Sequence, residues 1–86
     1  MLKVRTSTGF ECEIDPGAMN DMEVLDMVVR IDEGDALAYS PFLTKILGKE
    51  NKAKLYDHVR EADGRVPIEK VGTEVGEILE QAGEKK

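Results

Sequence analysis

Two groups of residues have the side-chain types that chemistry requires. The first is Cys12 with His58, the single cysteine and the single histidine of the chain. A nucleophilic site would need the two to meet in space beside an orienting carboxylate. However, Cys12 alternates in phase with Phe10 and Ile14, a pattern that predicts a small buried hydrophobic residue. The sequence therefore favours no Cys–His catalytic pair.

The second group is the acidic turn Asp32-Glu33-Gly34-Asp35. A calcium-binding EF-hand loop needs oxygen ligands at alternate positions and a glutamate at the twelfth, and this spacing is absent. A zinc site would have to be built largely from carboxylates. Neither phosphate-binding glycine motif, G-x-G-x-x-G or G-x-x-x-x-G-K-[ST], occurs. We therefore expect no catalytic residue, no metal, no cofactor and no enzyme activity.

Composition limits the class of partner. The chain has 18 acidic and 12 basic residues, a net charge of −6, and 41% hydrophobic residues. Nucleic-acid binding depends on clustered Lys and Arg that neutralise phosphates, so the acidic balance argues against a nucleic-acid or anionic-membrane partner. No apolar run is long enough for a membrane span, and no signal-peptide pattern is present. We expect a single cytoplasmic domain over residues 1–86.

The elements that would position any site begin with a hairpin over residues 2–14. Apolar residues alternate with polar ones on both sides of Thr8-Gly9, which predicts two strands with one apolar face. Asp15-Pro16-Gly17 ends the second strand. An isolated hairpin is only marginally stable in water, so the helices that follow must cover its apolar face.

Helical periodicity and stop signals predict four helices after the hairpin, which makes the fold class α+β. Asn20 with Glu23 resembles a capping box, and Ser40 before Pro41 resembles an N-cap. Gly48 and Gly64 suit left-handed C-caps. The predicted helices cover residues 21–33, 41–47, 50–62 and 67–82.

The first predicted helix has an unusually wide apolar face, covering roughly 220° of its circumference. This width indicates that the helix is either central to the fold or covered on a second side by another molecule. Three of the four methionines lie at its entrance or within it, either filling the core or adapting to partner surfaces. The seven apolar residues are Met22, Val24, Leu25, Met27, Val28, Val29 and Ile31.

The last predicted helix has a narrow apolar stripe beside two glycines, Gly72 and Gly76. Each glycine costs about 1 kcal/mol relative to alanine inside a helix. Either another backbone approaches that side closely, from within the fold or from a partner, or this near-terminal helix is simply weak and frays. A weak helix could also order only when bound. The stripe is formed by Ile68, Val71, Val75, Ile78, Leu79 and Ala82.

The order of these signals resembles that of the small tail assembly chaperones of long-tailed bacteriophages and prophages. The resemblance covers roughly Asp32 to Gln81. It implies a non-catalytic cytoplasmic protein of an infected or lysogenic bacterium that coats the tape measure protein and helps to recruit tail tube subunits. The stretches that carry it are Ile31-Asp32-Glu33-Gly34-Asp35, Ile46-Leu47-Gly48, Tyr56-Asp57-His58-Val59-Arg60, Asp63-Gly64-Arg65-Val66-Pro67 and the helix that follows.

A chaperone of this kind would use apolar helix faces to bind its client or a second copy of itself. The alternative is a small structural phage protein such as a head–tail connector component, which would remain in finished particles. A DNA-binding regulator is disfavoured by the negative charge. From the helical projections, the predicted partner-binding residues are Val24, Met27, Ile31, Gly72, Val75, Gly76 and Leu79.

Overall fold

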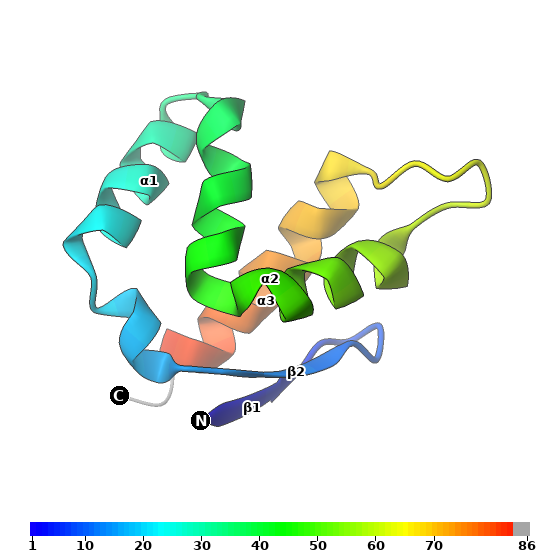
Figure 1. The fold of residues 1–86 in the computed structure, drawn as a ribbon, viewed down its shortest axis with the longest axis horizontal. Helices are drawn as coiled ribbons and strands as arrows, with labels where there is room; N and C mark the ends of the chain where they lie inside the picture. The colour runs from blue at the N-terminus through cyan, green and yellow to red at the C-terminus, as the bar shows by residue number, and fades with distance from the viewer. Residues whose placement is uncertain (84–86) are drawn as a thin grey trace.

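The N-terminal hairpin packs under a bent helix and against the C-terminal helix (Figure 1). The computed structural model describes residues 1–83. Strand β1 lies beside α3 and strand β2 beside α2. The predicted α+β class with an N-terminal hairpin is confirmed, but three α-helices follow instead of four. In chain order the elements are β1 (Leu2–Arg5), β2 (Glu11–Ile14), η1 (Pro16–Met19), α1 (Met22–Asp32), η2 (Ala36–Ala38), α2 (Tyr39–Val59) and α3 (Ile68–Gly83).

The hairpin pairs in the register that its alternation predicts. Leu2 lies opposite Ile14 and Val4 opposite Cys12, in antiparallel pairing. The residues of its apolar face are buried except Leu2, which packs at the core margin. Because side chains alternate between the two faces of a strand, a shift of one residue would expose this whole set.

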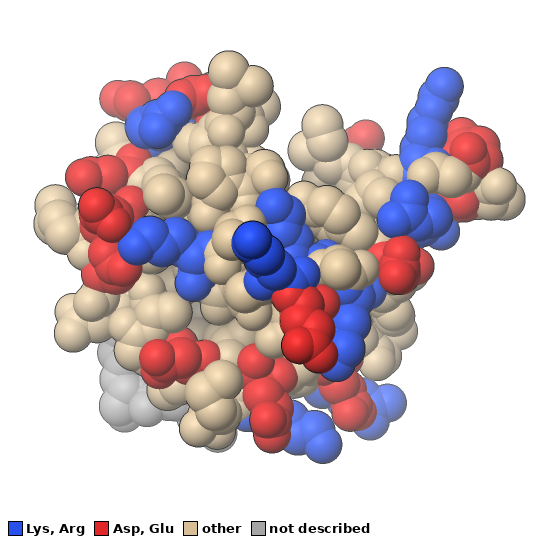
Figure 2. Space-filling model, in the orientation of Figure 1, with Lys and Arg blue, Asp and Glu red and all other residues tan. Residues whose placement is uncertain are grey.

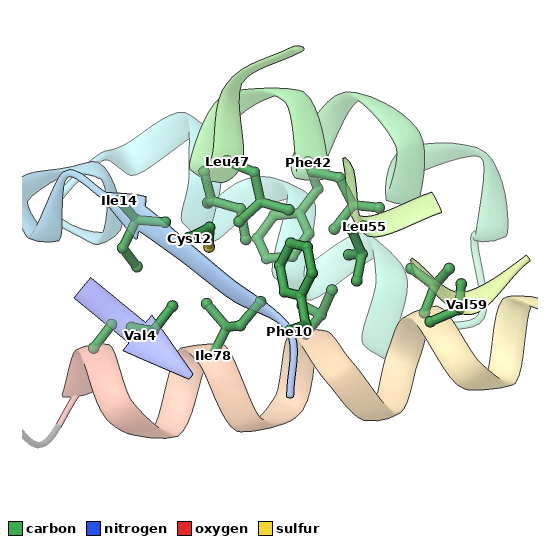
Figure 3. Packing of buried hydrophobic residues seen from close by; sticks show 14 of the residues in the cluster. Val4, Phe10, Cys12, Ile14, Phe42, Leu47, Leu55, Val59 and Ile78 are labelled. Atoms are coloured by element: carbon green, nitrogen blue, oxygen red, sulfur yellow. The ribbon is translucent and has the colours of Figure 1, made fainter. Parts of the chain in front are cut away.

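The core is almost entirely aliphatic and lies between the hairpin, α2 and α3. Figure 3 shows Phe10 and Cys12 of the hairpin pointing toward the side chains of α2, with α3 along the opposite side. Leu55 and Ile78 have no exposed surface. Within the described residues no helix combines the length and the apolar character that crossing a membrane requires.

Helix α1 is capped by Asp21, one residue later than predicted. The Asp21 carboxylate accepts a hydrogen bond of 2.9 Å from the backbone N–H of Glu23. Because Asp21 is the N-cap, Glu23 is at the second helical position, one residue too early for a capping box, and its carboxylate pairs with Lys45 Nζ at 3.0 Å. Lys45 also contacts Asp21 at 3.3 Å. The backbone N–H of Glu23, followed by Lys45, lowers the pKa of Asp21, and the two carboxylates raise the pKa of Lys45.

This cap makes the stability of the fold vary with pH in the acidic range. Because the pKa of Asp21 is lower in the folded chain, its contribution is complete above the unfolded-state pKa of about 3.9 and is lost as pH falls through the folded value. The variant Asp21→Asn keeps a capping oxygen but does not titrate there. Urea unfolding curves between about pH 2 and pH 6 should therefore depend less on pH in Asp21→Asn than in the natural chain. Identical pH profiles would contradict this assignment.

The predicted helices 41–47 and 50–62 are the two arms of one helix, α2. Gly48 interrupts it with non-helical angles of φ 82° and ψ 162°, so the predicted break at this glycine is confirmed as a kink that joins two helical arms. The predicted N-cap at Ser40 is wrong, since α2 begins at Tyr39 and the short η2 turn precedes it. The Ser40 hydroxyl instead accepts a hydrogen bond of 2.8 Å from Lys52 Nζ.

The second arm of α2 ends at Val59, earlier than predicted. Arg60 already has extended backbone angles. Gly64 does have a positive φ of 90°, but it lies in the turn after the helix, where its N–H donates to the carbonyl of Glu61. The predicted C-cap at Gly64 is therefore wrong. Helix α3 covers residues 68–83 instead of 67–82, with the carbonyl of Pro67 accepting its first helical hydrogen bond, from Val71.

Candidate functional site

Helix α1 lies at the margin of the fold (Figure 1), and part of its apolar surface is exposed. Of its apolar residues only Val24 is buried. Met22, Leu25 and Val29 are 67%, 50% and 48% exposed. Their spacing of three and four residues places them in one stripe, called here the α1 stripe. Of the two alternatives for this wide apolar face, a central position in the fold is wrong, because the core uses only the inner side of the helix.

Two apolar hollows lie along one face of α3. The first, of about 180 Å³, lies between α1 and the C-terminal half of α3. The second, of about 250 Å³, lies between α2 and the start of α3. Together they are called the α3 groove. The first is lined by Val28, Ile31, Tyr39, Phe42, Gly72, Val75, Gly76 and Leu79. The second is lined by Ala36, Tyr39, Ser40, Leu43, Tyr56, Val66, Ile68 and Val71.

Tyr39 separates the two hollows and explains one of the two helix glycines. A Cβ atom on Gly72 would lie 3.3 Å from the Tyr39 hydroxyl oxygen, so the missing side chain makes room for the tyrosine. A side chain of the fold, not a second backbone, therefore approaches Gly72. A Cβ atom on Gly76 would meet nothing within 4 Å. Gly76 thus leaves the exposed edge of the first hollow open.

The first hollow brings together five of the seven residues that the helical projections selected. These five come from both α1 and α3. Val75 is only 3% exposed, so it forms the base of the hollow and offers little contact area. Val24 lies in the core at 1% exposure, where the fold already uses its surface, and Met27 packs half-buried against the core. The five residues are Ile31, Gly72, Val75, Gly76 and Leu79.

Sequence reasoning missed part of the apolar surface. The α1 stripe was visible as apolar residues, but periodicity alone did not show which part of the wide face points outward. Tyr39 and Phe42 were not among the predicted partner-binding residues, and both line the first hollow. Ile68, 71% exposed, lines the second hollow and extends its apolar surface toward solvent.

Acidic residues border the groove. At about 100° per residue, Glu80 follows Gly76 on the outer side of α3, and Asp32 follows Val28 on α1, whereas Glu69 lines a separate hollow with Arg60 and Lys70. All three acidic residues are exposed, and none forms an ion pair within residues 1–83. On the face drawn in Figure 2, Lys and Arg gather across the middle, over α2, while acidic side chains lie along the margin formed by α1.

A separate polar cluster joins the hairpin turn to α2 and α3. The Thr8 hydroxyl donates to Glu74 Oε2 at 2.8 Å and lies 2.9 Å from His58 Nε2. Because the hydroxyl proton goes to Glu74, His58 Nε2 must donate to Thr8. The hydroxyl thus lies between the other two groups, whereas in a Ser–His–Asp triad histidine lies between hydroxyl and carboxylate. Ser7 adds two hydrogen bonds to Glu77, at 2.8 and 2.9 Å.

These contacts fasten the hairpin to α3 and leave no activated nucleophile. Glu74 is 3% exposed, and its Oε1 has no hydrogen-bond partner among the described residues. Cys12 is buried in the hairpin face, and this burial raises the pKa of its thiol, with Lys54 acting weakly in the opposite direction. A thiol with a raised pKa carries less of the reactive thiolate at neutral pH.

The acidic turn after α1 serves the backbone. Arg30 contacts Asp35 Oδ2 at 2.7 Å, and the other oxygen of Asp35 accepts from the N–H of Leu37 to cap η2. The hydrogen bond from Arg30 is the main reason that the pKa of Asp35 is lowered. Within residues 1–83, no group of three or more His, Cys, Asp or Glu side chains is placed to hold a metal ion.

The α3 groove and the α1 stripe are therefore the features with the clearest potential for binding. Comparison with protein-family models, with curated proteins and with solved structures gives no match for this chain. Apolar surface of this kind is typical of protein interaction sites. The argument for a function thus depends on this geometry and on the sequence resemblance.

Proposed function

We propose that this chain is a non-catalytic tail assembly chaperone of a long-tailed bacteriophage or prophage, acting in the host cytoplasm. Its client would be the tape measure protein, and it would aid tail tube assembly, with self-association as a further role of the same surfaces. The observation that carries the proposal is the presence of two apolar surfaces, the α3 groove and the α1 stripe. The resemblance of residues 32–81 supplies the family.

The physical argument is that these surfaces can shield apolar helix faces of a client. Full burial of one Met, Leu or Val side chain contributes about 1.5–3 kcal/mol, before the cost of ordering the two partners is subtracted. Several such side chains are exposed on one side of α1 and along α3. The net charge of −6 favours dispersal of the resulting complex.

The direct test is co-expression with the tape measure protein of the same phage, followed by affinity capture. Leu25→Glu should reduce the recovered tape measure protein by at least about tenfold, since a charge would interrupt the α1 stripe at an exposed position. Far-UV circular dichroism should remain unchanged. Ala62→Glu, which adds the same charge in the exposed loop before α3, is the matched control and should capture normally.

Equal capture by Leu25→Glu and the natural chain would exclude the α1 stripe from the client surface. Absence of capture by the natural chain would contradict the proposed function. The composition of purified phage particles separates the alternative role. A chaperone should be absent from them, whereas a head–tail connector component should be present at fixed stoichiometry.

A further inference from the structure

The α3 groove is long enough to bind a single helix. From Ile68 to Leu79, the face of α3 that lines both hollows advances about 16 Å, which is about three helical turns. The hollows on either side of Tyr39 lie roughly two turns apart along α3. An incoming amphipathic helix places residues i and i+7 at this separation, on one face. Two apolar side chains of such a helix could therefore enter the two hollows together.

The acidic rim indicates the charge of the occupant. Asp32 lies on the α1 side of the first hollow, and Glu80 lies on its α3 side. Lys52 donates to the Ser40 hydroxyl and lies 5.8 Å from the centre of the Tyr56 ring, which places a cation beside the second hollow, so the acidic rim belongs to the first hollow. An occupant with Lys or Arg on both flanks of its apolar stripe would place these cations against carboxylates that have no cationic partner within the described chain.

The same rim argues against a second copy of this chain as the occupant. The outward residues of α1 include Asp26, Asp32 and Glu33 beside the α1 stripe. If this helix entered the groove of another copy, acidic residues would face acidic residues. Like charges placed opposite each other at an interface oppose association. A basic helix of a different protein suits the groove better.

We propose that the α3 groove binds one amphipathic helix whose two apolar anchors enter the hollows on either side of Tyr39. The Lys or Arg residues that flank the anchor in the first hollow meet Asp32 and Glu80. The identification of this helix as a segment of the tape measure protein rests on the proposed function, whereas the groove, the helix and its basic flanks follow from the geometry.

A synthetic helical peptide of about 16 residues tests the groove directly, with leucine at i and i+7 and lysine on both flanks. Its binding to the full chain is measured by fluorescence anisotropy at low salt. Two matched peptides serve as controls, one with glutamate in place of every lysine and one with serine in place of the two leucines. Each control should bind at least about tenfold more weakly. Equal binding of the three peptides would overturn the proposal.

Variants of the chain locate the site. Gly76→Leu should fill the first hollow and weaken the lysine peptide at least about tenfold, whereas Gly76→Ala, the matched control, should bind within about threefold of the natural chain. Should Gly76→Leu fail to fold, the exposed double variant Asp32→Lys/Glu80→Lys carries the test. It should lose the lysine peptide and gain the glutamate peptide. An unchanged peptide preference in this variant would overturn the proposal.

Affinity capture of the tape measure protein separates this proposal from the proposed function. Equal capture by the natural chain and by folded Gly76→Leu would leave the chaperone role standing and remove the groove from it. Selective binding of the lysine peptide without capture of the tape measure protein would support the groove and overturn the proposed client. Failure of both measurements would overturn both.

Discussion

Replacement of Ile78 by alanine is expected to lower the free energy of unfolding by about 2–5 kcal/mol. Ile78 has no exposed surface and lies on α3 among the side chains of the hairpin and α2 (Figure 3). The deletion removes buried methyl groups and leaves a cavity that the surrounding aliphatic core fills only in part. A domain of this size has a total stability of about 4–13 kcal/mol, so the loss would be a large fraction of it. Urea unfolding followed by far-UV circular dichroism measures the change.

The neighbouring residue supplies the control for this experiment. Leu79 is only half-buried and lines the first hollow, so Leu79→Ala should cost clearly less stability than Ile78→Ala. Under the proposed function it should also weaken capture of the tape measure protein, because it removes apolar surface from the groove. Equal losses of stability in the two variants would contradict the assignment of Ile78 to the core and Leu79 to the groove.

Gly48→Ala is expected to destabilise the chain by about 1–3 kcal/mol. With φ 82° and ψ 162°, Gly48 has backbone angles that residues with a Cβ atom rarely adopt. A Cβ atom there would meet nothing within 4 Å, so the cost is backbone strain alone. The strain matters for the whole fold because the bend at Gly48 lets the second arm of α2 pass over the hairpin (Figure 1). Urea or thermal unfolding measures the effect.

Gly76→Ala is the matched substitution, with the opposite sign expected. Gly76 lies within α3 and has no positive φ, and an added Cβ would enter open space. Alanine should therefore raise stability by up to about 1 kcal/mol through its higher helix propensity. If both substitutions changed stability in the same direction, backbone strain would not explain why the bend needs a glycine at position 48.

Elements with strong local patterns were predictable from the sequence. Strict alternation on both sides of Thr8-Gly9 determined the hairpin and its register. Errors occurred where neighbouring residues compete for one role. Asp21 caps α1 in place of Asn20, and α2 begins before Ser40. Gly64 has the backbone angles expected of a cap but occupies a turn beyond the helix end. Local residue type predicts that a cap or turn forms in such a stretch, but tertiary packing decides which of several suitable residues takes that position.

The candidate site was predictable only in part, for the same reason. The apolar stripe and two glycines of α3 were evident, and Ile31 lines the first hollow together with residues of that helix. Val24 and Val75 were also selected as partner-binding residues, yet the fold buries both. The apolar arc of α1, roughly 220° wide, contains more residues than one packed element can cover. The sequence does not show which part of the arc that element buries.

The sequence by itself determined the α+β class, the hairpin, the helical faces, the acidic balance and the weakness of any catalytic pattern. Each of these depends on local periodicity or on residue counts. Only the tertiary structure decided that α1 keeps an apolar stripe in solvent, that Tyr39 occupies the space beside Gly72, and that α1 and α3 form one groove. These features depend on which helix surfaces meet across the fold. Because burial of apolar area is non-directional, one apolar pattern is compatible with many pairings of helices, and only the packing of the whole chain selects among them.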